Sequence, residues 1–264
     1  GSVDGVEIDH CLIQNTNGTG PAAGIDIEPA AETNEVAENV HVHDNALVGN
    51  NNAGVTAYAA KGTHIKNLHI DHNTLVQNAA WMPGSIVTNQ VEGTEIDHNH
   101  LVNASGSQFN TIWLMSTSNT NVHDNYGRNS SITVAADNPA AGYASPSGQI
   151  HDNYISQVVI NHNGFSSANN HLPTDASRAV INSSGADLNY QNAVTAPVDV
   201  ATNEKVTFKN FTVGGQPVNV TSNPSDTVLD HHASINWTGD ISFDVDGSAL
   251  SQVGDSDNTI RYSK

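Results

Sequence analysis

The sequence is poor in cysteine and in aromatic residues, and each shortage excludes a class of protein. A single cysteine, Cys11, leaves no intrachain disulfide framework, and we expect it to be a small core residue. Aromatic residues make up 5% of the chain, fewer than the core of a globular α/β enzyme normally holds. The chain has no run of about 18 apolar residues, which excludes a membrane-spanning helix.

Positive charge is also scarce: 8 Lys and Arg face 27 Asp and Glu, a formal net charge of −19. Such a surface has few cations to replace phosphate counterions and is repelled by anionic membranes, so we expect neither nucleic acid nor a membrane as partner. The charge favours solubility in an open, salty medium, which predicts a secreted or cell-surface protein. The first repeat begins almost directly after Gly1 and Ser2, so we expect that an upstream signal or cap has been removed.

One short segment recurs six times and defines a repeat. Its copies read Glu7-Ile-Asp-His-Cys, His41-Val-His-Asp-Asn, His69-Ile-Asp-His-Asn, Glu95-Ile-Asp-His-Asn, Asn121-Val-His-Asp-Asn and Gln149-Ile-His-Asp-Asn. The aligned anchors are Ile8, Val42, Ile70, Ile96, Val122 and Ile150, which are 34, 28, 26, 26 and 28 residues apart. Self-similarity at this period predicts a solenoid. Leucine-rich repeats have a similar period, but their Leu-x-x-Leu-x-Leu frame is absent, and hexapeptide helices have shorter, more regular coils.

A second apolar column lies upstream of each anchor. It reads Gly24-Ile-Asp-Ile-Glu-Pro, Gly54-Val-Thr-Ala-Tyr, Gly84-Ser-Ile-Val-Thr, Asn110-Thr-Ile-Trp-Leu and Ser131-Ile-Thr-Val-Ala. We interpret these segments as the first strands of successive coils and name them the first-strand row. Because side chains alternate along a strand, Ile25 and Ile27 are expected inside and Asp26 and Glu28 outside.

The run from Gly24 to Pro29, followed by the Val-His-Asp-Asn coils, resembles right-handed parallel β-helix proteins of the pectate-lyase-like superfamily. The resemblance covers about residues 3–175. It implies an all-β fold, a right-handed parallel β-helix of about six coils. The superfamily includes polysaccharide lyases, glycoside hydrolases, uronan epimerases and phage tailspikes. The active-site series of polygalacturonases and the Asp-Pro-His-Glu of mannuronan epimerases are absent, so no catalytic residue carries over by motif.

Beyond Ile150 the repeat loosens, and we expect a β-helix over residues 1–190 and a small all-β region over 191–264. Residues 172–185 carry a helix start signal at Thr174 or Asp175 and a stop at Gly185, which predicts a capping helix for the solenoid. Period-2 alternation predicts strands in the C-terminal region at 206–213, 218–221, 233–238 and 241–245.

The repeated Asp–His or His–Asp pairs favour a structural role. Equivalent positions of neighbouring coils are roughly 4.8 Å apart, so acid and imidazole can pair from coil to coil. The asparagines that follow each pair are expected to stack as an amide ladder that satisfies turn backbone groups (Asn45, Asn73, Asn99, Asn125 and Asn153). One catalytic site does not need six copies; a metal site built from paired histidines is the alternative.

Outward residues that occur once are better candidates for catalysis. Asp26 and Glu28 share one face about 7 Å apart, which suits an acid and a base in glycoside hydrolysis, or oxygen ligands of Ca²⁺. Lyase chemistry needs a base near a neutralised carboxylate, and Tyr58, Lys61 and His64 are the secondary catalytic candidates.

Substrate-binding candidates are Thr56, Trp113 and Arg128. Thr56 and Trp113 are expected to point outward from the first-strand row, where an aromatic ring can stack on a sugar. Arg128 is one of the few cations in the helix. A polyanionic glycan would need Ca²⁺ at carboxylates such as Asp26, Glu28 or Asp137, whereas a neutral glycan would not.

These residues predict a secreted carbohydrate-active enzyme, a glycoside hydrolase or polysaccharide lyase that cleaves a polysaccharide along the first-strand row. The alternative is a non-catalytic module: a glycan-binding adhesin, a surface stalk or a phage-fibre module, the last of which predicts a homo-oligomer. Ice or mineral binding predicts regular outward threonine columns, which Tyr58 and Trp113 interrupt.

Overall fold

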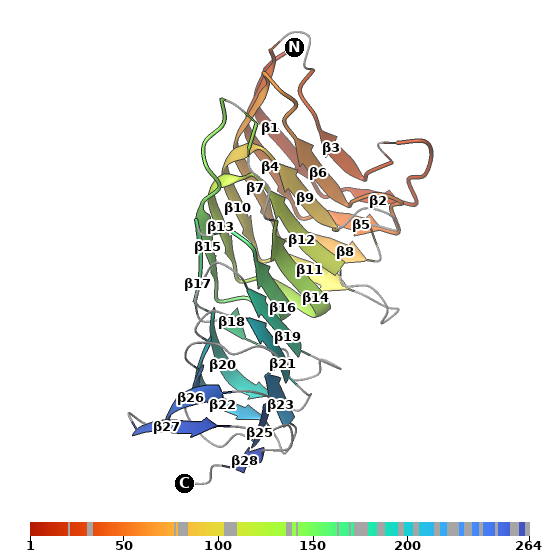
Figure 1. Cartoon of the computed structure of the whole chain (residues 1–264). Coiled ribbons are helices and arrows are strands. Elements are labelled where there is room, and N and C mark those ends of the chain that lie inside the picture. The colour runs from red at the N-terminus through yellow and green to blue at the C-terminus, as the bar shows by residue number, and fades with distance from the viewer. Residues whose placement is uncertain are drawn as a thin grey trace.

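Strands of successive coils pair in parallel, and the computed structural model of the chain is a parallel β-solenoid (Figure 1). The structure describes all residues except 21, 31–33, 77, 79–83, 103–109, 136–138, 141, 163, 169, 172–178, 184–187, 195–197, 203–205, 214–216, 221–226, 230–233, 238–239, 246–247, 254–258 and 262–264. Side chains are described as far as residue 170, apart from those of 110, 128, 129, 156 and 157. In these ranges every regular element is a strand, which confirms the predicted all-β class. No helix among the described residues is long and apolar enough to span a bilayer.

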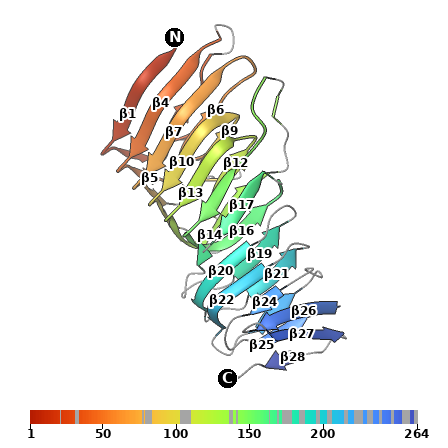
Figure 2. The same cartoon turned by 90° about the vertical axis from the view of Figure 1, so that its left-hand side faces the viewer.

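The repeated His/Asp segments form a seven-stranded parallel sheet, which we name the ladder sheet. Its strands in spatial order are β1 (Val3–Asp9), β4 (Val36–His43), β7 (His64–Asp71), β10 (Val91–Asp97), β13 (Ser118–His123), β15 (Gly148–His151) and β17 (Phe165–Ala168). The anchors that define the repeat are in register: Ile8 pairs with Val42, Val42 with Ile70, and Ile70 with Ile96. Figure 2 shows this sheet, with β1 to β13 side by side.

Two further rows of parallel strands complete the coils. The short-strand row contains β2 (Leu12–Gln14), β5 (Ala46–Val48), β8 (Thr74–Val76) and β11 (His100–Val102). The first-strand row contains β3 (Ile25–Ile27), β6 (Val55–Tyr58), β9 (Ile86–Asn89) and β12 (Asn110–Met115). Strands β14 (Tyr126–Val134) and β16 (Tyr154–Ile160) extend both rows and join them.

The regular helix has about four coils rather than the six expected. Four successive coils contain one separate strand of each row, from β1 to β12. In the coil that begins with β13, the second and third strands merge into the single strand β14. Its pairing with β16 shifts in register between Gly127 and Ser131. The sequence anchors Val122 and Ile150 still stack in register, so the repeat in the sequence extends further than the three-strand coil.

Apolar side chains from all three rows meet inside the coils. The largest fully buried ones are Leu47, Ile65, Leu68, Ile70, Leu75, Ile86, Ile96 and Leu101. Each contacts its equivalents one coil away because the parallel register places like residues in columns. The core is therefore a stack of Leu, Ile and Val layers, and it positions the polar side chains on the outside.

The prediction of a capping helix over residues 172–185 is wrong for residues 179–183, the part of this segment that the structure describes. Ala179–Ser183 forms strand β19, and Val180 and Ile181 pair in parallel with Gln157 and Val158 of β16. The β-branched pair Val180–Ile181 suits a pleated strand, and β16 offers an edge for it. Tertiary pairing has therefore overridden the local helix signals.

Parallel pairing continues past residue 190, where the sequence suggested a separate region. The strands from residue 170 onwards, besides β19, are β18 (Asn170–His171), β20 (Leu188–Val194), β21 (Val198–Thr202), β22 (Val206–Val213), β23 (Pro217–Val220), β24 (Thr227–Leu229), β25 (Ser234–Trp237), β26 (Asp240–Val245), β27 (Ser248–Val253) and β28 (Thr259–Arg261). Four of them, β22, β23, β25 and β26, lie where alternation predicted strands. Among the described strands only β25–β28 and β26–β27 pair antiparallel. The division of the chain at residue 190 stays a prediction.

The predicted amide ladder is confirmed. The Nδ2 group of Asn73 donates to Oδ1 of Asn99 at 3.1 Å and to the Val42 carbonyl at 2.9 Å. The same pattern runs from Asn45 to Asn153, and Asn170 extends it by one further coil. Buried backbone groups of the turn are thereby satisfied in each coil.

Cys11 occupies the first position of the asparagine column, but it is exposed, so its assignment to the core is wrong. Its backbone N–H donates to Oδ1 of Asn45 at 3.0 Å, as the ladder asparagines do to one another. Strand β1 is the edge strand of the ladder sheet and pairs only with β4, so no described strand covers this turn from the other side.

Candidate functional site

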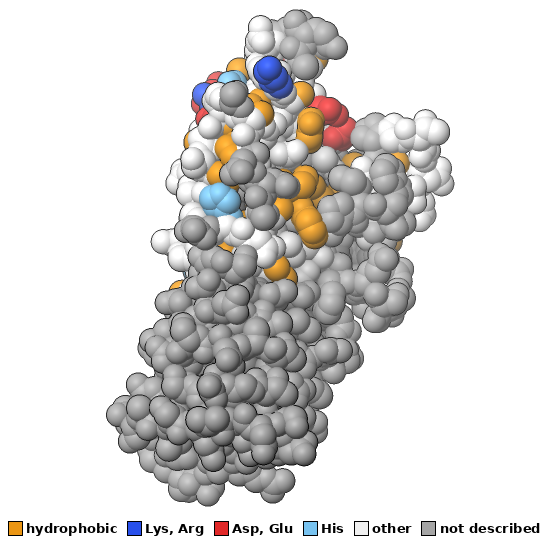
Figure 3. All heavy atoms as spheres, in the orientation of Figure 1, with side chains coloured by type: hydrophobic (Ala, Val, Ile, Leu, Met, Phe, Trp, Pro, Cys, Tyr) orange, Lys and Arg blue, Asp and Glu red, His pale blue; other side chains and the backbone are white. Residues whose placement is uncertain are grey.

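The first-strand row has one outward column that combines charged, polar and aromatic side chains. Asp26 is in register with Thr56, Thr56 with Val87, and Val87 with Trp113. Ile25 and Ile27 are buried on either side of exposed Asp26, as alternation predicted. In Figure 3, acidic side chains lie at the β3 end of this row, and apolar side chains gather over its middle.

Asp26 and Glu28 form a carboxylate pair at the end of β3. Both side chains are exposed, with buried Ile27 between them, so they share a face. Partial burial and the negative charge of Glu28 raise the pKa of Asp26 above its ordinary value. Asp26 therefore keeps its proton to higher pH than an ordinary aspartate, which is the property of a general acid.

Two buried polar atoms in the same outward column lack hydrogen-bond partners. They are the Thr56 hydroxyl and the Trp113 indole N–H. Thr56 is only 8% exposed and Trp113 is half-buried, so the open sugar-stacking surface expected from Trp113 is partly covered. Buried polar groups without a partner are rare in native structures, and each one calls for an explanation such as a water molecule or an ion at that place.

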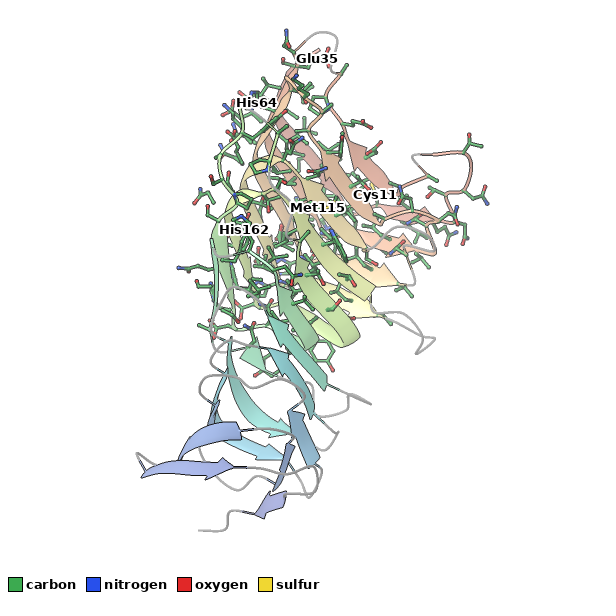
Figure 4. All side chains as sticks on the ribbon, in the orientation of Figure 1. Cys11, Glu35, His64, Met115 and His162 are labelled. Atoms are coloured by element: carbon green, nitrogen blue, oxygen red, sulfur yellow. The ribbon has the colours of Figure 1, made fainter. Side chains whose placement is uncertain are left out.

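Tyr58 and Lys61 lie at the far end of β6, where both side chains are exposed. Tyr58 is in register with Asn89, and Asn89 with Met115, so it belongs to a second outward column beside that of Asp26. Figure 4 labels Met115 in the middle of this row. No described contact joins Lys61 to Asp26 or Glu28.

His64 begins β7 and belongs to the ladder sheet, in register with Val36 rather than with any first-strand residue. Its ring packs against Tyr143 with centroids 5.3 Å apart, and its Nδ1 lies 3.6 Å from Oε1 of Glu92. Tyr143 comes from the connection between β14 and β15, and its hydroxyl donates to the carbonyls of Ala60 and Thr63. In Figure 4 this connection passes beside His64. His64 is thus held by a structural loop, away from the carboxylate pair.

Two remaining candidates cannot be placed as site residues. Arg128 lies in β14 with its backbone in register with Val102, on the short-strand row rather than the first-strand row, and its side chain is outside the described set. Asp137 lies outside the described residues. Of the nine predicted residues, the structure thus places Asp26, Glu28, Thr56, Tyr58 and Trp113 along the first-strand row.

On the ladder sheet, each repeated acid and imidazole pair is first of all a local contact. In every coil from β1 to β15, Nδ1 of the histidine lies 2.7–2.9 Å from Oδ2 of the adjacent aspartate. The second member of each pair adopts a left-handed φ of 50–54° (His10, Asp44, His72, His98, Asp124 and Asp152). Asp, Asn and His tolerate this conformation better than most residues, which explains why the order of the pair can alternate.

A neighbouring column supplies the contacts between coils. Nε2 of His69 lies 2.7 Å from Oδ1 of Asp97, and Nε2 of His43 lies 2.8 Å from Oε1 of Glu7. The rings of His41 and His69 stack with centroids 4.6 Å apart and planes 1° apart. Cross-coil pairing was predicted and is confirmed, but the column of Glu7, His41, His69 and Glu95 was missed as its partner. In the sequence, this column is visible as the first residue of each repeat copy.

The carboxylates change the protonation of several ladder groups. Hydrogen bonds to Asp44 and Glu7 raise the pKa of His43 to about 9. A hydrogen bond to Asp71 raises the pKa of His72. At Asp71, burial opposes ionisation, but hydrogen bonds from His72 and His41 outweigh it and lower the pKa. The outer face of the ladder sheet is therefore a network of hydrogen-bonded acid–imidazole pairs.

Three groups on this face bring metal-ligating atoms within 4.8 Å of one another. They are Glu7 with His41 and His43, His41 with His69 and Asp71, and Glu95 with Asp97 and His123. Imidazole nitrogen with carboxylate oxygen is a ligand set of transition-metal sites. Asp26 and Glu28, which the sequence suggested for Ca²⁺, are not among these groups.

An exposed aromatic column on the short-strand row was also missed. His100 is in register with Tyr126 and Tyr126 with Tyr154; the two tyrosines are 41% and 42% exposed. The rings of His100 and Tyr126 meet at 5.3 Å. In the sequence, this column is visible as the residue that directly follows the ladder asparagine in each copy (Asn99, Asn125 and Asn153).

No protein-family model, no curated protein and no solved structure matches the chain.

Proposed function

We propose that the protein is a secreted carbohydrate-active enzyme that binds a polysaccharide along the first-strand row and hydrolyses it. The observation that carries the proposal is the outward column of that row. It combines the perturbed carboxyl of Asp26 with two buried polar atoms that have no partner, on Thr56 and Trp113. A glycan supplies hydroxyl groups that satisfy such atoms, although both are covered and side chains must move to admit it.

Membership of the pectate-lyase-like superfamily is part of the same proposal. The parallel coils and the buried–exposed–buried pattern of Ile25, Asp26 and Ile27 support it. In this reading Asp26 protonates the glycosidic oxygen and Glu28 activates a water molecule. Side chains two residues apart on one strand are separated by about 7 Å, which lies in the range of inverting glycosidases.

The test is the release of reducing ends by Asp26→Asn and Glu28→Gln variants. Each substitution keeps the shape of the side chain and removes the acid or the base, so we expect a loss of roughly a hundredfold or more in kcat. Glu38→Gln, a carboxylate on β4 of the ladder sheet, is the matched control and retains activity. Undiminished cleavage by the Asp26→Asn, Glu28→Gln double variant would show that the site is wrongly assigned.

The raised pKa of Asp26 also predicts the pH dependence. A general acid must be protonated, so activity falls as pH rises through the raised pKa of Asp26. We expect the alkaline limb of kcat against pH above the ordinary aspartate value of 3.8. If the alkaline limb of the pH profile persists unchanged in the Asp26→Asn variant, Asp26 is not the general acid.

A second candidate, glycan binding without cleavage, is favoured by the exposed column of His100, Tyr126 and Tyr154. One ring per coil, repeated in register, provides a row of faces on which sugar rings can stack. Affinity electrophoresis should show weaker retention for Tyr126→Ala with Tyr154→Ala than for Leu12→Ala, an exposed residue of the same column. Equal retention of both variants would exclude this column as the binding surface.

The net charge of −19 separates two substrate classes. A polyanionic glycan is repelled, and its binding would need Ca²⁺ bridging at Asp26 and Glu28, whereas a neutral glycan needs no metal. We therefore propose that a neutral polysaccharide is the substrate, with Ca²⁺ required only for an acidic one.

A further inference from the structure

We propose that the outer face of the ladder sheet binds a divalent transition-metal ion, of the Zn²⁺ class, between His41, His69 and Asp71. This site lies on a different sheet from Asp26 and does not depend on the proposed hydrolysis. His41 comes from β4, and His69 and Asp71 come from β7, so the ion would link two coils. The three ligand atoms lie within 4.8 Å of one another.

The contacts around Asp71 provide one firmly held ligand. Asp71 is buried, and its Oδ2 lies 2.7 Å from Nδ1 of His72, which fixes the carboxylate. Its other oxygen, Oδ1, faces Nε2 of His41 at 2.5 Å and Nε2 of His69 at 3.7 Å. Carboxylate ligands oriented by a second hydrogen bond are typical of protein metal sites.

The two imidazoles can close around an ion with small movements. Their side chains are 37% and 36% exposed, and their rings stack with parallel planes. Zinc–nitrogen bonds are about 2.0–2.1 Å long, so two nitrogens on one ion are at most about 4.2 Å apart. The ligand atoms already lie within 4.8 Å of one another, so a small rotation of a ring reaches this spacing, and partial exposure leaves room for it.

His69 would exchange one partner for another. Its Nε2 lies 2.7 Å from Oδ1 of Asp97, a contact that the metal replaces. Asp97 keeps its second contact, to Nδ1 of His98 at 2.7 Å, so the move leaves no isolated buried carboxylate.

Ligand chemistry selects the metal. Two nitrogens and one oxygen suit Zn²⁺, Ni²⁺ or Cu²⁺, whereas Ca²⁺ takes six to eight oxygen ligands. The two other groups are weaker choices. Glu7 with His41 and His43 shares His41 with the proposed site, and Glu95 with Asp97 and His123 contains a single imidazole.

The experiment titrates the chelator-treated protein with ZnCl₂ in a calorimeter, with CaCl₂ and MgCl₂ as comparisons. We expect Zn²⁺ uptake by the wild-type chain and no comparable uptake of Ca²⁺ or Mg²⁺. His41→Gln with His69→Gln should abolish the tight site. His100→Gln removes an exposed histidine of the short-strand row and should bind Zn²⁺ like the wild type.

X-ray absorption at the zinc edge of the wild-type protein provides a readout that needs no variant. Two imidazole nitrogens in the first coordination shell support the site. A shell of oxygens alone, absence of uptake, or equal uptake by the His41→Gln, His69→Gln protein would overturn it. Because no glycan is used, failure of this test leaves the proposed hydrolysis unaffected.

Discussion

At the scale of single residues, the asparagine column shows how a repeated side chain fixes the turn of every coil. Asn99 is buried, donates to the carbonyls of Ile70 and Asp97, and accepts from the backbone and side chain of Asn73. The same residue type recurs at the same place in each copy, so this ladder was predictable from the sequence. The raised pKa of Asp26 was not, because it depends on burial by neighbours far away in the sequence.

Replacing Asn99 by alanine should lower the free energy of unfolding by at least about 2 kcal/mol, because several buried partners lose their hydrogen bonds together. Asn17→Ala removes an exposed asparagine and should change stability little. Urea unfolding of the two variants and the wild type measures the difference. Equal midpoints for Asn99→Ala and Asn17→Ala would contradict a stabilising role for the ladder.

His43 gives the ladder sheet a pH dependence with a defined sign. Its pKa is raised from 6.5 to about 9, so its charged pairs stabilise the fold fully below pH 6.5 and are lost as pH rises through about 9. The melting temperature should therefore fall over this window. His43→Gln should flatten the fall, while His100→Gln keeps the wild-type slope; identical slopes for both variants would refute the role of His43.

At the scale of elements, pairing partners decide what local sequence does not. Residues 179–183 carry helix signals nearby, yet they form β19 because β16 presents an edge in register. The loop between β14 and β15 is a similar case. Its Tyr143 reaches the turn after β6, about eighty residues earlier in the chain, and no periodic pattern foretold this contact.

Removing the Tyr143 hydroxyl should loosen that loop. The hydroxyl lies 2.6 Å from the Ala60 carbonyl and 2.7 Å from the Thr63 carbonyl, so Tyr143→Phe should cost about 1 kcal/mol. Hydrogen exchange should become faster at residues 60–64 and 142–147 and stay unchanged in β10. Unchanged exchange at residues 60–64 would show that the contact does not hold the turn.

At the scale of the whole molecule, the solenoid separates two polar surfaces. The ladder sheet has repeated side chains that pair from coil to coil, whereas the outward column of the first-strand row is built from single-copy residues. The fold class followed from the period of the anchors, but the number of complete coils did not, because strand merging at β14 leaves the anchor spacing intact. Placement of His64 on the ladder sheet, in register with Val36, likewise depended on a loop path that the sequence does not encode locally.

The most direct test of the proposed hydrolysis is a digestion screen of plant, algal and bacterial polysaccharides with the wild-type chain, read by reducing ends and by absorbance of unsaturated products. Hydrolysis at Asp26 and Glu28 predicts new reducing ends, without unsaturated products, from at least one neutral glycan. Retention of a glycan without any new reducing end, or the appearance of unsaturated products, would contradict it.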